Sequence, residues 1–117
     1  MTIDPRDWKA ERNKTLNLFS VEGSIPHAAH QLPDGGYMVT AIVRLLKLDH
    51  QPLLPDILRL RLYIEQERRH PYNPPAQPLS HLVSYHPLTR EAEEDTCTKV
   101  RIVHNGDTVI ELEVKDA

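Results

Sequence analysis

The sequence predicts an α+β fold in which a curved antiparallel sheet wraps around one central apolar helix. Three observations favour it: a nearly continuous apolar run at 38–48, clean alternation of apolar and polar residues at 57–67, and two apolar segments flanking Asn105-Gly106-Asp107. A helix that is apolar on almost every side must be covered by other structure, and one amphipathic sheet can cover it by curling. The 117 residues suit one domain, expected at 15–117 after an N-terminal extension at 1–14.

The central helix is expected at about 36–48. Asp34 is a favourable residue for capping the first free N–H groups of a helix. Gly35 and Gly36 leave those N–H groups bare, so a carbonyl or phosphate of another molecule could approach the helix start. The polar residues of the run fall on one narrow stripe at spacings of four and three: Thr40, Arg44 and Lys47.

Three further segments are predicted to be strands because they are apolar or alternate, at 15–21, 57–67 and 80–85. Within 57–67, the apolar residues share one face and Arg59, Arg61 and Tyr63 share the other. The remaining segments are expected to be irregular: 22–31, the proline-rich loop 68–79, and the acidic run 91–95, which is expected to be a solvated turn.

The last two strands, 98–104 and 108–114, are predicted to form a hairpin whose register follows from side-chain parity. Asn105-Gly106 is typical of a two-residue type I′ turn, but such a loop would place Ile102 opposite Val109. A three-residue loop over 105–107 instead places Ile102 opposite Ile110 and pairs opposite charges on the other face. The prediction is therefore the three-residue loop, with four cross-strand pairs: Ile102–Ile110, Val100–Leu112, Arg101–Glu111 and Lys99–Glu113.

Composition limits the function classes. Lys and Arg number 14 against 17 Asp and Glu, a net charge of −3, so there is no basic footprint for nucleic acid. The single cysteine, Cys97, excludes an internal disulfide and favours a reducing cytosol. Residues 1–12 lack the pattern of a secretory signal, and no stretch approaches the roughly 20 apolar residues of a membrane span. We therefore expect a cytoplasmic protein with neither a nucleic acid nor a membrane as partner.

The motif Pro33-Asp34-Gly35-Gly36-Tyr37, with Arg44 in the expected helix and the strands of the C-terminal half, resembles the hotdog-fold acyl-CoA thioesterase-like family over roughly 16–114. Members carry Pro-His-Gly-Gly-Tyr at the start of the central helix, so Asp34 stands where the family usually has His. The resemblance implies a hotdog-like fold and hydrolysis of acyl thioesters, with coenzyme A or a carrier protein as the thiol part. Such a fold leaves a sheet edge and a helix start open to a partner, so we expect a homodimer with substrate between the two subunits. No cofactor is expected.

The candidate site follows from this motif. The N–H groups of Gly36 and Tyr37, helped by the helix dipole, could polarise the thioester carbonyl. Asp34 is the one carboxylate close to that position, so it is the candidate catalytic base or nucleophile, with a purely structural helix cap as the alternative. The candidate substrate-binding residues are Gly35, Gly36, Tyr37, Thr40, His27 and His30, and no metal site is expected.

Two other functions are left open by the sequence. A non-catalytic hotdog-like domain that binds an acyl ligand or a partner protein is favoured by the missing motif histidine. A dehydratase or isomerase on the same fold would need His27 or His30 as its base. The arginines at 59, 61, 68 and 69 could meet the phosphates of coenzyme A, or could form an outward strand face paired with Glu65 and Glu67. Cys97 is expected to be a buried thiol rather than a nucleophile.

Overall fold

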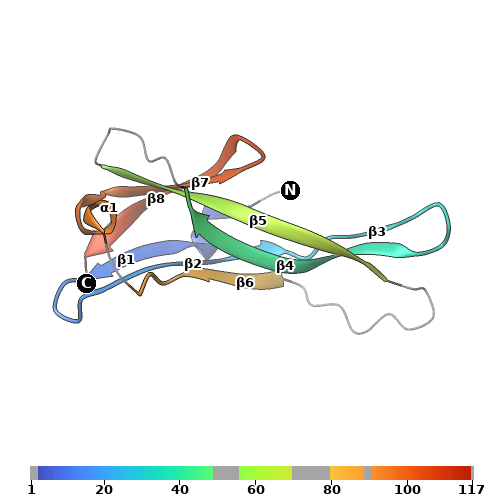
Figure 1. Ribbon diagram of the computed structural model, residues 1–117, viewed down its shortest axis with the longest axis horizontal. Coiled ribbons are helices and arrows are strands. Elements are labelled where there is room, and N and C mark those ends of the chain that lie inside the picture. The colour runs from blue at the N-terminus through green and yellow to red at the C-terminus, as the bar shows by residue number, and fades with distance from the viewer. Residues whose placement is uncertain (1–2, 49–55, 70–79, 89–90, 117) are drawn as a thin grey trace.

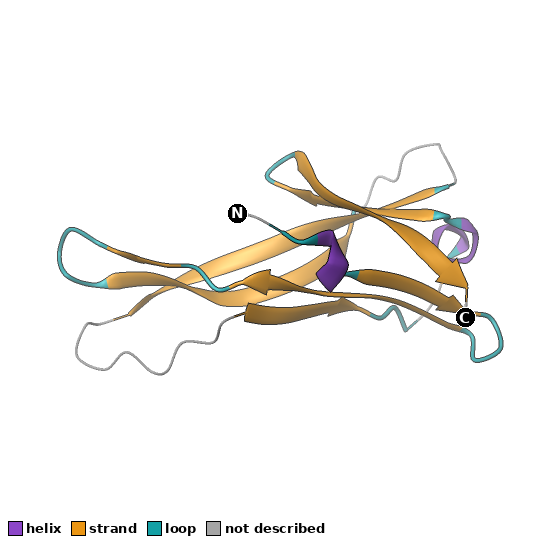
Figure 2. Ribbon diagram, turned by 180° about the vertical axis from the view of Figure 1, so that it is seen from behind, coloured by secondary structure: helices purple, strands orange, loops and turns teal. Residues whose placement is uncertain are grey.

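The protein is built almost entirely of β-strands, as its computed structural model shows (Figures 1 and 2). The structure describes residues 3–48, 56–69, 80–88 and 91–116. Eight strands form one sheet in the order β3-β4-β5-β7-β8-β1-β2-β6. Their bounds are β1 Lys9–Asn13, β2 Leu18–Pro26, β3 Ala29–Gln31, β4 Tyr37–Lys47, β5 Ile57–Arg69, β6 Ser80–Tyr85, β7 Lys99–His104 and β8 Asp107–Asp116.

Helices are short in the described part of the chain. A 3₁₀ turn spans Pro5–Asp7, and the α-helix α1 spans Ala92–Thr96. Within the described ranges, no helix has the length and apolarity needed to cross a membrane.

The residues expected to form a central helix form strand β4 instead, so the predicted α+β, hotdog-like fold is wrong. β4 pairs antiparallel with β5 along its whole length. A register shift between Thr40 and Ile42 interrupts the period-two alternation, and the resulting run of consecutive apolar residues imitates a buried helix. Four β-branched residues, which lose side-chain freedom in a helix, favour the strand: Val39, Thr40, Ile42 and Val43.

The sheet curls into a half-barrel (Figure 1). The chain passes from one layer to the other between β2, which pairs with β1 and β6, and β3, which pairs with β4. β8 joins the two layers because it pairs with β7 on one side and with β1 on the other. The β1–β8 and β5–β7 ladders are parallel, which corrects the expected wholly antiparallel sheet. The curl brings β4 beside β6, and we call the line between these two strands the seam.

The core lies inside this curl and confirms the predicted faces of β5. Leu58, Leu60 and Leu62 are buried, whereas Arg59 and Arg61 point to the other face. The predicted strand at 80–85 is confirmed as β6. Residues from both layers meet the β5 leucines in one cluster, which includes Phe19, Val21, Ile25, Val83, Val100 and Ile102.

The C-terminal hairpin has the predicted register but a different loop. All four predicted cross-strand pairs are present. The loop nevertheless contains only Asn105 and Gly106, both at positive φ (52° and 82°), as a type I′ turn requires. Parity is restored by a register shift after Ile102, which leaves Val109 as an extra residue in β8. The expected three-residue loop is therefore wrong, and a bulge takes its place.

Three other segments differ from the expectations. Residues 22–31, expected to be irregular, lie mostly in β2 and β3. Part of the expected extension 1–14 supplies β1, which lies between β8 and β2 in the sheet. The acidic run 91–95 is not a solvated turn, because it enters α1 and buries Glu94. Most of the proline-rich loop predicted at 68–79 lies outside the described residues.

The contact between Trp8 and Gly23 gives a test of this packing. A Cβ at Gly23 would lie 2.0 Å from Cδ2 of the Trp8 indole, whose Nε1–H donates to the Ser24 carbonyl at 3.1 Å. We expect Gly23→Ala to lower the free energy of unfolding by about 3 kcal/mol, the upper end of the usual cost of overpacking. Trp8 is the sole tryptophan, so its fluorescence reports the displacement during denaturant unfolding.

Ser24→Ala is the matched control, since it keeps the carbonyl that accepts from Trp8. If Gly23→Ala kept the Trp8 fluorescence emission and the stability of the wild type, the contact between Trp8 and Gly23 would be contradicted.

Candidate functional site

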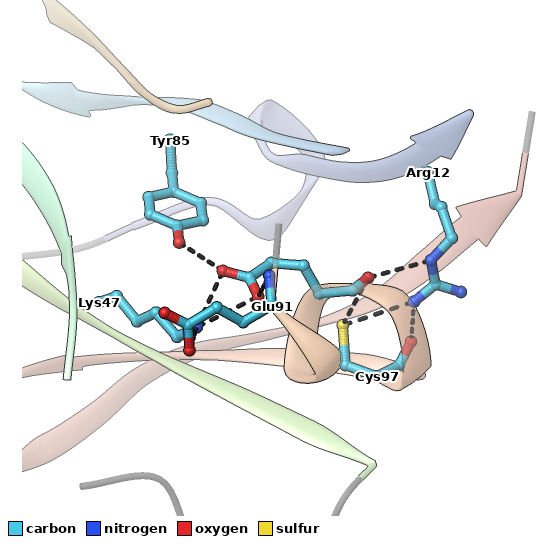
Figure 3. A network of polar contacts seen from close by, with 6 residues as sticks. Arg12, Lys47, Tyr85, Glu91 and Cys97 are labelled. Atoms are coloured by element: carbon cyan, nitrogen blue, oxygen red, sulfur yellow. Dashed lines mark hydrogen bonds and ion pairs between the residues drawn. The ribbon is translucent and has the colours of Figure 1, made fainter. Parts of the chain in front are cut away.

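At one end of the seam, the buried carboxylate of Glu94 joins α1 to β4 and β6 (Figure 3). Lys47 Nζ donates to its two oxygens at 3.0 and 3.1 Å, and the Tyr85 hydroxyl donates to Oε1 at 2.8 Å. The Glu94 side chain is 1 % exposed. Burial alone would raise the pKa of this carboxyl, but the hydrogen bonds from Lys47 and Tyr85 outweigh it and hold the pKa below its ordinary value.

Arg12 of β1 fixes the other side of α1 (Figure 3). Its guanidinium, on a residue only 7 % exposed, donates to the backbone carbonyls of Glu94 and Cys97 and pairs with Asp116 at 3.3 Å. Burial raises the pKa of the Cys97 thiol, so this group is a poor nucleophile and the expectation of a buried thiol is confirmed. These partners satisfy the buried charges around α1, and we interpret the whole network as structural.

Near the other end of the seam, the curled sheet forms an open cavity of about 510 Å³, which we call the histidine cavity. This volume falls in the range of small-molecule sites, roughly 300–1,000 Å³. Apolar and hydrogen-bonding side chains both line it, from the end of β2, from β4 and β5, and from the β7–β8 hairpin. The lining residues are Ile25, Pro26, His27, Ala28, Thr40, Ile64, Gln66, His104 and Asn105.

Two histidines meet at this cavity. His27 Nδ1 lies 2.7 Å from His81 Nε2, a distance at which one proton is shared between the two nitrogens. The other ring nitrogen, His27 Nε2, is buried and has no hydrogen-bond partner among the described residues. Burial, followed by the effect of the neighbouring His27, lowers the pKa of His81. The neutral form of His81 is therefore favoured, and Nε2 of His27 is left without a hydrogen bond to a described residue.

The strand register explains why these two side chains meet. His81 lies directly opposite Ile25 in the β2–β6 ladder, and His27 follows two residues later, at the crossing between the layers. Thr40 fixes that crossing, because its Oγ1 accepts the Ala28 N–H at 3.2 Å and its N–H donates to the Ala28 carbonyl at 3.0 Å. Thr40 is only 5 % exposed although it is polar.

The structure brings together two of the predicted site residues, His27 and Thr40, in the histidine cavity. His30 lies exposed on β3. The remaining candidates belong to the loop between β3 and β4 or to its end: Asp34, Gly35, Gly36 and Tyr37.

Asp34 caps a turn in that loop rather than a helix. Its Oδ1 accepts the Gly36 N–H at 3.1 Å, and its carboxylate pairs with Arg68 of β5. Gly35 adopts φ +88°, which suits a glycine in a tight turn. The Gly36 N–H that was expected to polarise a carbonyl is thus bonded to Asp34, and Tyr37 begins β4.

Sequence reasoning did not place His81, Gln66 or His104 in a site. His81 lies in a strand that the sequence predicts correctly, but its neighbour in the sheet is the end of β2, within the segment 22–31 that the sequence predicts to be irregular. Gln66 faces Thr40 across the β4–β5 ladder, a pairing that only the strand interpretation of β4 reveals. Pairing 22–26 with 80–85 as antiparallel strands places His81 opposite Ile25, close to His27. That register is the signal that could have found the histidine pair.

Comparisons with protein-family models, with curated proteins and with solved structures gave no match. Within the described ranges, no group of three or more His, Cys, Asp or Glu side chains is arranged to hold a metal ion.

Glu94→Gln tests the structural role of the network. The amide keeps the size of the side chain but leaves Lys47 without its buried counter-charge. Breaking a fully buried pair costs about 3–5 kcal/mol; we expect about 2–3 kcal/mol here. The lower value follows because the Lys47 side chain is 22 % exposed and also pairs with Glu91 at 3.3 Å.

Denaturant unfolding measures this loss, and Glu113→Gln on the exposed face of β8 is the control. Equal stability of the two variants would show that the network is not structural.

The lowered pKa of His81 predicts a pH dependence of stability. The pKa of His81 in the folded protein lies below the ordinary value of 6.5, so below about pH 6.5 the unfolded chain binds more protons. The free energy of unfolding should therefore fall as the pH is lowered from about 6.5 towards the pKa of folded His81. His81→Gln places an amide near the position of Nε2 without a titrating group, so the slope in this window should decrease.

His30→Gln, on exposed β3, should keep the wild-type slope. A slope unchanged by His81→Gln would assign the effect to another group.

Proposed function

We propose that the histidine cavity binds a small acyl ligand, a molecule with an apolar chain and a carbonyl or carboxylate oxygen. The observation that carries this proposal is the buried Nε2 of His27, which lacks a partner among the described residues. A buried polar atom without a hydrogen bond costs about 1–3 kcal/mol. If His81 Nε2–H donates to His27 Nδ1, the proton of His27 lies on Nε2, and a ligand oxygen can accept it.

The rest of the lining supports the apolar part of such a ligand. Ile25, Pro26, Ala28 and Ile64 provide apolar walls, and the other five lining side chains carry hydrogen-bonding groups. Each buried CH₂ contributes about 0.8 kcal/mol, so affinity should rise about fourfold with each carbon until the cavity is filled.

Hydrolysis of an acyl thioester is the second candidate, and the same histidine pair favours it. If His27 Nδ1–H instead donates to His81 Nε2, His27 Nε2 carries a free lone pair and can accept a proton from water as it attacks the thioester carbonyl. The thiol would then leave with a proton. In this version the base belongs to the histidine pair, because Asp34 is held by Arg68 in the β3–β4 loop.

The homodimer expected from the sequence stays a prediction. β3 ends the strand order, and all three of its residues are exposed, so it offers an edge for pairing with a second copy.

Titration calorimetry with hexanoate, octanoate and decanoate tests the binding proposal. We expect affinity to increase with chain length and to fall at least about tenfold in His27→Asn, since a hydrogen bond to a charged group contributes about 1.5–3 kcal/mol. The Asn amide can replace Nδ1 towards His81 but leaves nothing at the position of Nε2. His27→Gln, whose amide lies near the Nε2 position, should retain more affinity, and His30→Gln should match the wild type.

Absence of binding, or equal affinities for His27→Asn and the wild type, would contradict the proposal. Thiol release from an octanoyl thioester separates the two candidates. Release that is lost in His81→Gln would favour the hydrolase, and binding without release would favour the non-catalytic module.

A further inference from the structure

The hydrogen bonds of His104 determine which of its ring nitrogens carries the proton. This residue ends β7 and lines the histidine cavity. Its Nδ1 lies 3.1 Å from the backbone carbonyl of Leu62, which can only accept a hydrogen bond. Its Nε2 lies 3.4 Å from the side-chain nitrogen of Asn105, which can only donate. Both contacts assign the proton of the neutral ring to Nδ1, so Nε2 keeps its lone pair.

The lone pair on His104 Nε2 is weakly used by the described residues. Its contact with Asn105, at 3.4 Å, is longer than the roughly 2.7–3.2 Å typical of N–H donors. Asn105 is also exposed, so water competes for its amide. Because Asn105 lines the histidine cavity together with His104, this acceptor lies in the wall of that cavity.

The other polar groups of the lining offer a ligand different partners. The Thr40 hydroxyl is engaged with Ala28, since it accepts the N–H at 3.2 Å and donates to the carbonyl at 3.4 Å. The exposed amide of Gln66 can donate or accept. In the proposed function, His27 donates to the ligand through Nε2. His104 Nε2 instead requires a donor from the ligand, and an unsubstituted acyl chain has none.

We propose that the acyl ligand carries a hydroxyl group and that His104 is the residue that selects it. This inference rests on the proposed function, in which His27 binds the carbonyl or carboxylate oxygen of the same ligand. The hydroxyl donates its proton to His104 Nε2, and its oxygen can accept from the Asn105 amide. A site that hydrogen-bonds a ligand hydroxyl discriminates against the analogue that lacks it. The ligand class is therefore a hydroxylated acyl compound.

Calorimetry with decanoate and with its 2-, 3- and 10-hydroxy derivatives tests this selection. We expect at least one derivative to bind the wild type about fivefold more tightly than decanoate, the ratio that one neutral hydrogen bond gives. His104→Asn keeps a donor for the Leu62 carbonyl but leaves nothing at the position of Nε2. In this variant the ratio of the two affinities should fall to about one.

Two control variants separate the hydroxyl contact from other effects. His30→Asn makes the same exchange on exposed β3, outside the cavity, and should keep the wild-type ratio. His27→Asn should weaken decanoate and its hydroxy derivative by the same factor, because it removes the contact that they share. Thermal melts verify that the variants are folded.

The tautomer of His104 has a direct test that needs no ligand. A two-bond proton–nitrogen-15 spectrum of the histidine side chains distinguishes a protonated ring nitrogen from one with a lone pair. We expect the Nδ1–H form for His104, with a shift of the Nε2 signal when the hydroxy derivative binds. The Nε2–H form in the free protein would overturn the inference.

The outcomes distinguish a failure of this inference from a failure of the proposed function. If decanoate binds and none of its hydroxy derivatives binds more than twofold more tightly, the hydroxyl site is overturned and the proposed function stands. A preference for the hydroxyl that survives in His104→Asn would also overturn the assignment, and its loss in Gln66→Met would transfer it to that amide. If neither decanoate nor any derivative binds, both proposals fail.

Discussion

The carboxylate of Glu94 closes the side of the curled sheet that the strand ladders leave open. β4 and β6 lie beside each other at the seam, yet they are not neighbours in the strand order. Lys47 from β4 and Tyr85 from β6 both donate to this one carboxylate, and Arg12 from β1 binds the backbone carbonyl of the same residue. A charge buried to this extent is tolerated only with such partners, so the position of α1 and the spacing of the seam depend on each other.

The histidine cavity lies near the other end of the seam, where β4 and β6 are still side by side. There the chain crosses between the layers at His27, and reciprocal hydrogen bonds between Ala28 and Thr40 keep the crossing in place. A crossing between layers interrupts the ladders and leaves polar side chains inside the curl. The same happens at His104, where the β5–β7 ladder ends. The histidine cavity, which His27 and His104 both line, therefore lies where regular pairing stops, and there a β-sheet can present hydrogen-bonding groups to a ligand.

Sequence reasoning was reliable where one face of a strand is buried and the other is solvated. The alternation in β5 and the charge pairs of the C-terminal hairpin fixed their faces and register, because a slip of one residue would expose the core. It failed at bulges. The shift between Thr40 and Ile42 turned a strand into an apparent helix, and the extra Val109 was mistaken for a longer loop. Of the candidate site, His27 and Thr40 were identified, but His81 and the burial of Glu94 depend on contacts between distant strands, which local pattern does not encode.

The most direct test of this account is an isotope-filtered NOE spectrum of the labelled protein with unlabelled decanoate. Contacts from the alkyl chain to the methyl groups of Ile25 and Ile64 are predicted, because both line the histidine cavity. The same sample should show cross-strand contacts between Arg44 and Tyr63, which only a β4 strand produces. Ligand contacts to Trp8 and Leu82, which line a different cavity, or no ligand contacts at all, would contradict the assignment of the site to the histidine cavity.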